Sequence, residues 1–263
     1  MKEFISDYRE GYAALELDGG FFRPDSILAR DLSVLITSIQ FVEKKDETPL
    51  RWLDLMSGCG IRALRWGLES VLPNAEREEC CGNVEIWVND ADSNRKDLIQ
   101  RNLQPLLKEK ISVFFRNDLA QVFLSKSYLD QIFFDLIDLD CFGCPNSLLQ
   151  PIIQVLAFDG ILILSSTDGR SPTGHDRLGA IRSLSASART HPASWEIALR
   201  FQLAAIARQA WLLGRGVEPL VCFSDGRTFR IIVRVRRHLA LNEEAQLGFI
   251  SRCYLCGGQT SQT

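Results

Sequence analysis

The 263-residue sequence predicts an α/β fold with a mostly parallel, seven-stranded sheet that ends in an antiparallel hairpin. Short apolar runs alternate with helical patterns, which is typical of right-handed βαβ units. One apolar run, Phe133–Leu139, ends on acids and then breaks into a turn rich in Cys, Gly and Pro, as strands do at the carboxyl edge of an open sheet. Asp225-Gly226 between two late apolar runs is a hairpin signal.

Each element follows from its local pattern. After Pro24, a helix is expected over Asp25–Phe41 with Asp25 or Ser26 as its N-cap. An irregular arm is expected between Gly169 and Ser194. The strands are expected at Arg51–Met56, Val84–Val88, Ile111–Phe115, Gln131–Leu139, Gly160–Ser166, Glu218–Ser224 and Thr228–Arg236, and the other helices at Ile61–Val71, Ser93–Lys108, Ser147–Ala157 and Trp195–Leu213.

Composition excludes several classes of protein. A content of 46% hydrophobic and 24% charged residues is that of a globular protein rather than a disordered chain. No apolar run reaches the roughly 18 residues that span a bilayer, and acids interrupt the first twenty residues, where a signal peptide would be apolar. A cytoplasmic protein that does not span a membrane is therefore expected. Cys253 and Cys256 form half of a zinc site at most, with Cys80-Cys81 as distant candidates, and no bound metal is expected.

The charge is unevenly distributed despite a net value of −3. Between Arg170 and Arg237 there are twelve arginines, four acids and no lysine, which leaves +8. Arginine forks favour contacts with phosphate groups. The segment therefore predicts a nucleic-acid surface, with solvated helix faces and strand edges as the alternative.

Strand ends in the first half of the chain predict a nucleotide-type cofactor. Gly58 and Gly60 follow the first strand, where glycine lets the backbone approach a ligand closely. Asp90 closes the second strand, where it can bind ribose hydroxyls, and Asp118 closes the third, where it can bind an adenine amino group. A GxGxxG motif is absent, which disfavours NAD. With the antiparallel end of the sheet, this pattern indicates the Rossmann-like fold of S-adenosylmethionine-dependent methyltransferases.

The second half predicts an amino-group substrate. Asp138 and Asp140 end the fourth strand on one face, and Phe142 follows them. The lone pair of an exocyclic base nitrogen is delocalised, so carboxylates that accept its N–H groups would assist methyl transfer. Phe142 could stack on the base, and Asp168 would flank the same cleft. In the alternative interpretation, Asp138 caps a turn and Phe142 belongs to the core.

Several motifs together resemble the tRNA guanine-N2 dimethyltransferase family. They are FxxPDSILARDLSVL (Phe21–Leu35), LDLMSGCGIRALR (Leu53–Arg65), VNDAD (Val88–Asp92), FDLIDLDCFGCP and the WEIALRFQLAAIARQA helix. The resemblance implies that the chain uses S-adenosylmethionine to make N2-methyl- or N2,N2-dimethylguanosine where the D and anticodon stems of tRNA meet. It also implies cofactor contacts from Arg30, Arg62, Asp90, Asp118 and Leu119, catalysis by Asp140, and substrate contacts from Glu196 and Arg200.

The resemblance also divides the chain. Residues 1–50 are expected to pack over the cofactor site, residues 51–238 to form the methyltransferase domain, and residues 239–263 to be the remnant of a tRNA-binding domain, which a partner subunit could supply. Arg23-Pro24 replaces the family's asparagine–proline, and Cys141 replaces a proline that stiffens the turn after Asp140. Methylation of another RNA or a small amine, and a non-catalytic RNA-binding descendant, are the alternatives.

Overall fold

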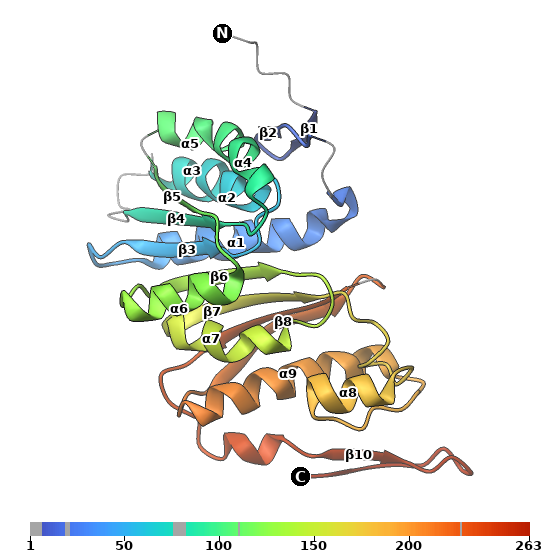
Figure 1. The fold of residues 1–263 in the computed structure, drawn as a ribbon. Helices are drawn as coiled ribbons and strands as arrows, with labels where there is room; N and C mark the ends of the chain where they lie inside the picture. Colours follow the sequence, from blue (N-terminus) through green and yellow to red (C-terminus); the bar gives the residue numbers. More distant parts are fainter. Residues whose placement is uncertain (1–6, 19–21, 76–82, 110, 227) are drawn as a thin grey trace.

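The computed structural model describes residues 7–18, 22–75, 83–109, 111–226 and 228–263. Its central sheet contains seven strands in the order β5-β4-β3-β6-β7-β9-β8 (Figure 1). The five strands from β5 to β7 are parallel, whereas β9 is antiparallel to both of its neighbours. The predicted fold class is thereby confirmed. The strands are β3 (Leu50–Asp54), β4 (Val84–Asn89), β5 (Ser112–Arg116), β6 (Phe134–Asp140), β7 (Leu156–Ser166), β8 (Val217–Ser224) and β9 (Phe229–Val235).

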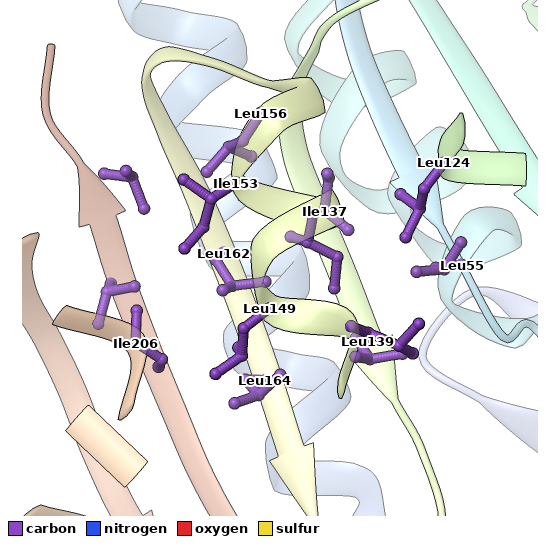
Figure 2. Close-up of a cluster of buried hydrophobic side chains, with 14 of the residues drawn as sticks. Leu55, Leu124, Ile137, Leu139, Leu149, Ile153, Leu156, Leu162, Leu164 and Ile206 are labelled. Carbon is purple, nitrogen blue, oxygen red and sulfur yellow. The ribbon is translucent and has the colours of Figure 1, made fainter. Parts of the chain in front are cut away.

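Helices cover both faces of the sheet because successive strand residues point in opposite directions. Ile137 and Leu139 of β6 and Leu162 and Leu164 of β7 pack with α6, α7 and α9. Figure 2 shows Leu149 and Ile153 of α7 among these strand side chains. Alternate residues of the same strands, such as Leu136 and Ile163, pack with the first group of helices. The first group is α1 (Ile27–Glu43), α2 (Ile61–Arg65), α3 (Leu72–Ala75), α4 (Lys96–Asn102) and α5 (Gln104–Lys108), and the second is α6 (Ala120–Leu129), α7 (Leu149–Val155), α8 (Arg177–Leu184) and α9 (Ser194–Leu212).

Two of the expected helices are interrupted. The α2 helix passes into a π-helical turn at Trp66–Val71 before α3 begins. The expected helix Ser93–Lys108 splits into a 3-10 turn, α4 and α5, and the break precedes Pro105, which has no N–H to continue the hydrogen-bond ladder.

Other local expectations were wrong. The arm expected to be irregular contains α8. Ser26 occupies the expected N-cap position of α1 but makes no side-chain capping hydrogen bond; its hydroxyl instead accepts a hydrogen bond from Arg230 at 3.1 Å. Two hairpins were not foreseen: β1 (Tyr8–Glu10) with β2 (Ala13–Leu15), and β10 (Phe249–Arg252) with β11 (Gln259–Gln262).

Buried carboxylates hold the two ends of the described chain against the central domain. Glu10 accepts hydrogen bonds from Arg30 of α1 and Arg65 of α2, which fixes the first hairpin. Glu243 accepts hydrogen bonds from the Trp211 indole and from the backbone N–H groups of Val217 and Ala240, which fixes the segment after β9. The boundaries at 50 and 238 stay predictions.

Within the described ranges, no helix is both long and apolar enough to cross a membrane. Six cysteines in those ranges are free thiols, and no three His, Cys, Asp or Glu side chains there gather as a metal site. Cys80 and Cys81 lie outside the described residues.

Candidate active site

A cavity of about 380 Å³ opens at the carboxyl ends of β3, β4 and β6. It is lined by loops that follow these strands and by the start of α1. Six of the residues singled out from the sequence line it: Arg30, Gly58, Arg62, Asp90, Asp140 and Phe142. Strands that are far apart in the sequence therefore bring the two predicted halves of the site to one place.

The glycine turn is coupled directly to Asp90. The Gly58 N–H donates a hydrogen bond to Asp90 Oδ2 at 2.8 Å, and the Asp92 N–H donates one to Oδ1 at 2.9 Å. These bonds orient the carboxylate, whose remaining lone pairs can accept hydrogen bonds from hydroxyl groups. A Cβ built on Gly58 meets no atom within 4 Å, so the backbone of the turn is open to a ligand. Gly60 instead adopts φ +80 before α2 and does not line the cavity.

Arg30 forms a buried part of the cavity wall. It donates two hydrogen bonds to Glu10, at 2.6 and 2.5 Å, and others to the carbonyls of Arg23 and Pro24. The N-terminal hairpin therefore holds this guanidinium in place beside the cavity.

Arg62 joins the two predicted catalytic acids. Its Nη2 lies 2.5 Å from Asp140 Oδ2, and its Nε lies 3.1 Å from Asp138 Oδ2. Asp138 is buried and also accepts a hydrogen bond from Ser33 at 2.9 Å, whereas the Asp140 side chain is 26% exposed. Only Asp140 is open to the cavity, and Asp138 lies beneath it as a support for Arg62.

Electrostatics differ sharply among these carboxyl groups. Burial raises the pKa of Asp140, but Arg62 and Arg230 outweigh it and hold the pKa at about 2. Burial raises the pKa of Asp138 despite the opposing effect of Arg62. The group that faces the cavity is therefore an ionised hydrogen-bond acceptor across the physiological pH range.

Two contributors to the site escaped the sequence reasoning. Arg230 lines the cavity, lies 3.5 Å from Asp140 Oδ1 and donates a hydrogen bond to Ser165. Asn89 also lines the cavity and donates hydrogen bonds to the carbonyls of Leu55 and Asp118. An arginine inside the apolar run TFRIIV was the signal for the first, and the asparagine beside Asp90 was the signal for the second.

Besides Gly60 and Asp138, five further predicted residues lie outside the cavity lining, and their roles stay predictions. Asp118 pairs with Lys126 at 2.8 Å, and Leu119 is 63% exposed at the start of α6. Asp168 accepts hydrogen bonds from two backbone N–H groups of the following turn, whereas Glu196 and Arg200 form an exposed ion pair with each other at 2.6 Å.

The strand order, the glycine turn and the acid after β4 together define the class: a Rossmann-like fold of the S-adenosylmethionine-dependent methyltransferase type. A sequence profile of the N2,N2-dimethylguanosine tRNA methyltransferase family matches residues 14–263. The chain belongs to this family.

Relatives and solved structures agree with this membership. The chain is 28% identical over 243 residues to a tRNA (guanine(26)-N(2))-dimethyltransferase of Saccharolobus solfataricus, with 91% of this chain and 58% of the relative covered. It is 27% identical over 246 residues to the protein of that name from Thermococcus kodakarensis, with 88% and 60% covered. The chain thus spans about three fifths of these relatives. Trm1 from Pyrococcus horikoshii, solved with S-adenosyl-L-methionine, shares the fold with a TM-score of 0.82 at 22% identity, covering 98% of this chain and 69% of that one.

Proposed function

We propose that this chain is a tRNA methyltransferase that transfers a methyl group from S-adenosylmethionine to the exocyclic N2 of a guanosine, at tRNA position 26 as in the names of its relatives. The products are N2-methylguanosine and N2,N2-dimethylguanosine. One observation carries the proposal: the ionised Asp140 carboxylate opens into the cavity and lies next to Phe142, whose side chain is 69% exposed.

The cavity fits S-adenosylmethionine. Asp90 offers oriented oxygens for two ribose hydroxyls, and Gly58 leaves the backbone open beside them. Arg30, Arg62 and Arg230 supply positive charge near a cofactor carboxylate. The cofactor supplies an electrophilic methyl group bonded to sulfur.

The protein then has to present the guanine amino group to that methyl group. The Asp140 carboxylate accepts an N–H hydrogen bond, which orients the nitrogen lone pair and provides an acceptor for the proton that leaves. Phe142 offers a ring on which the guanine can stack. Arg62 and Arg230 keep Asp140 ionised and fixed.

The proposal also covers the division of the chain, its contacts with tRNA, its location and a partner. Residues 1–50 cover the cofactor, residues 51–238 carry the chemistry, and the exposed arginines of residues 170–189 contact tRNA phosphates. A cytoplasmic location and a partner subunit that adds tRNA contacts complete it. A low KM for tRNA with this chain alone would remove the partner from the proposal.

The test is methyl transfer from labelled S-adenosylmethionine to unmodified tRNA transcripts, followed by nucleoside analysis. We expect N2-methylated guanosine with the wild-type chain and a loss of about 10²–10⁴-fold in kcat for Asp140→Asn. Asp130→Asn, an exposed acid at the end of α6, is the matched control and should be fully active. Cofactor binding without transfer to any tRNA would contradict the proposal.

A further inference from the structure

We propose that Trp195 is a stacking platform for a nucleobase of the RNA strand that adjoins the target guanosine. The inference rests on the proposed function and adds a recognition residue to it. Trp195 lies in the first turn of α9, and its ring stacks on Phe229 with centroids 5.3 Å apart and planes inclined by 27°. Phe229 is 1% exposed, whereas Trp195 is 48% exposed. Phe229 thus supports one face of the indole while much of the ring stays open to solvent.

The platform lies at the sheet edge where the cavity opens, on the face that α9 covers. Phe229 stands between Thr228 and Arg230 in the chain, and both of these residues line the cavity. In the sheet, Phe229 is paired with Ser166, which directly precedes a third lining residue, Thr167. Phe142 follows β6 at the same edge of the sheet, and β7 lies between β6 and β9. The exposed rings of Phe142 and Trp195 therefore lie on the two sides of the end of β7.

The start of α9 is held firmly. The Ser194 hydroxyl accepts a hydrogen bond from the His191 N–H at 2.8 Å and donates one to the His191 carbonyl at 2.6 Å. The Ala193 N–H donates a hydrogen bond to His191 Nδ1 at 2.9 Å. A ring that is already fixed in place loses little conformational entropy when it binds a ligand.

The surroundings favour RNA as the ligand. Every nucleobase has a π-face, so stacking on an indole tolerates any sequence next to the target. Exposed arginines of the preceding arm, Arg170, Arg177, Arg182 and Arg189, attract the phosphates of such a strand. The acid next to Trp195, Glu196, is paired with Arg200.

Two substitutions of Trp195 separate stacking from support of the fold. Trp195→Phe keeps an aromatic face, whereas Trp195→Leu keeps apolar bulk on Phe229 without one. We expect Trp195→Leu to raise the Kd for an unmodified tRNA transcript about 5- to 150-fold, the equivalent of about 1–3 kcal/mol per stacked base. Trp195→Phe should retain most of the affinity, and both variants should keep the wild-type Tm and KM for S-adenosylmethionine.

Filter binding in the presence of S-adenosylhomocysteine measures the Kd without any methyl transfer. Trp211→Phe is the control, because Trp211 lies near the other end of α9 and bonds Glu243. Equal tRNA affinities for wild type and Trp195→Leu would overturn the inference, as would a parallel loss of cofactor affinity. A wild-type chain that binds tRNA through Trp195 but methylates no tRNA would overturn the proposed function alone.

Discussion

At the scale of single residues, Asp54 is the most unusual group of the fold. It ends β3 beside Asp138 of β6, is 1% exposed, and neither carboxyl oxygen has a hydrogen-bond partner among the described residues. Burial raises its pKa to about 8, aided by Asp138 and Asp140 and opposed by Arg62. At neutral pH this carboxyl is largely protonated, so the acids around Arg62 carry fewer charges than the sequence suggests.

The raised pKa predicts a stability that falls as pH rises. A carboxyl whose folded pKa exceeds its unfolded value near 4 stabilises the fold fully below that value, and the contribution disappears as pH rises through 8. We expect the free energy of unfolding to fall by up to about 1.4 kcal/mol per pH unit on this account. Urea unfolding of the ligand-free protein at pH 5, 6.5 and 8 measures it, and Asp54→Asn should flatten the dependence.

Asp46→Asn is the control for this experiment. The hydrogen bonds from Lys44 and Thr48 hold the pKa of Asp46 at about 2, below the range tested. Its substitution should leave the slope between pH 5 and 8 unchanged. An equal slope for wild type and Asp54→Asn would show that Asp54 does not titrate as described.

Arg230 should control the ionisation of Asp140. Removal of its guanidinium in Arg230→Met takes away one of the two cations that lower the pKa of this acid. We expect the acid limb of the kcat–pH profile for tRNA methylation to move to higher pH. Arg234→Met, four residues along the same strand and paired with Glu218, should leave the limb in place. An unmoved limb in Arg230→Met would show that Arg62 alone is sufficient.

Residues at strand ends were open to sequence reasoning, and residues inside strands were not. Gly58, Asp90 and Asp140 were identified because glycine turns and acids after apolar runs meet at one sheet edge. Arg230 reaches that edge only because β9 runs antiparallel and begins there. Nothing in the sequence says which buried carboxyl a buried arginine will meet.

At the scale of elements, Arg215 joins three segments behind the sheet. It is 6% exposed and donates hydrogen bonds to the carbonyls of Ile153, Leu156, Ala157 and Val235. The end of α7, the start of β7 and the end of β9 are therefore tied by one side chain.

Loss of this guanidinium should destabilise the protein without touching the active site. Arg215→Met leaves several buried carbonyls unsatisfied, and we expect about 2–4 kcal/mol less stability in urea unfolding. Arg215 and Arg237 both lie over the Phe158 ring, but Arg237 is exposed. Arg237→Met is therefore the control. Similar free energies of unfolding for the two variants would contradict a stabilising role for the Arg215 hydrogen bonds.

The sequence pattern predicted helices and strands correctly where apolar residues mark the buried face clearly. The α6 helix was missed because Val122, Tyr128 and Leu129 are exposed apolar residues that blur its period. The α8 helix was missed because only Ala180 and Leu184 of its eight residues are buried. Both helices depend on tertiary packing more than on their own sequence pattern.

At the scale of the whole molecule, the arginine-rich segment separates into distinct groups. Arg215 and Arg230 are buried, while Arg234 and Arg236 pair with Glu218. The arginines of the segment between Gly169 and Ser194 that contains α8, here called the α8 arm, form an exposed group: Arg170, Arg177, Arg182 and Arg189. A surface depression there is lined by Arg177, Arg189 and Tyr254 of the β10–β11 hairpin. Figure 1 shows α8 and the tip of this hairpin on the side toward which β6 points, the side of the cavity.

This division predicts which arginines tRNA phosphates contact. Each phosphate contact releases counterions. The loss of one contact therefore makes the negative slope of log K against log salt shallower by about one. Arg177→Ala with Arg189→Ala should weaken tRNA binding and reduce the slope by about two, as measured by filter binding between 50 and 200 mM salt. Arg234→Ala with Arg236→Ala removes the same charge from arginines already paired with an acid and should change neither quantity. Equal losses in both double variants would mean that tRNA responds only to overall charge, and the α8 arm would then have no special part in binding.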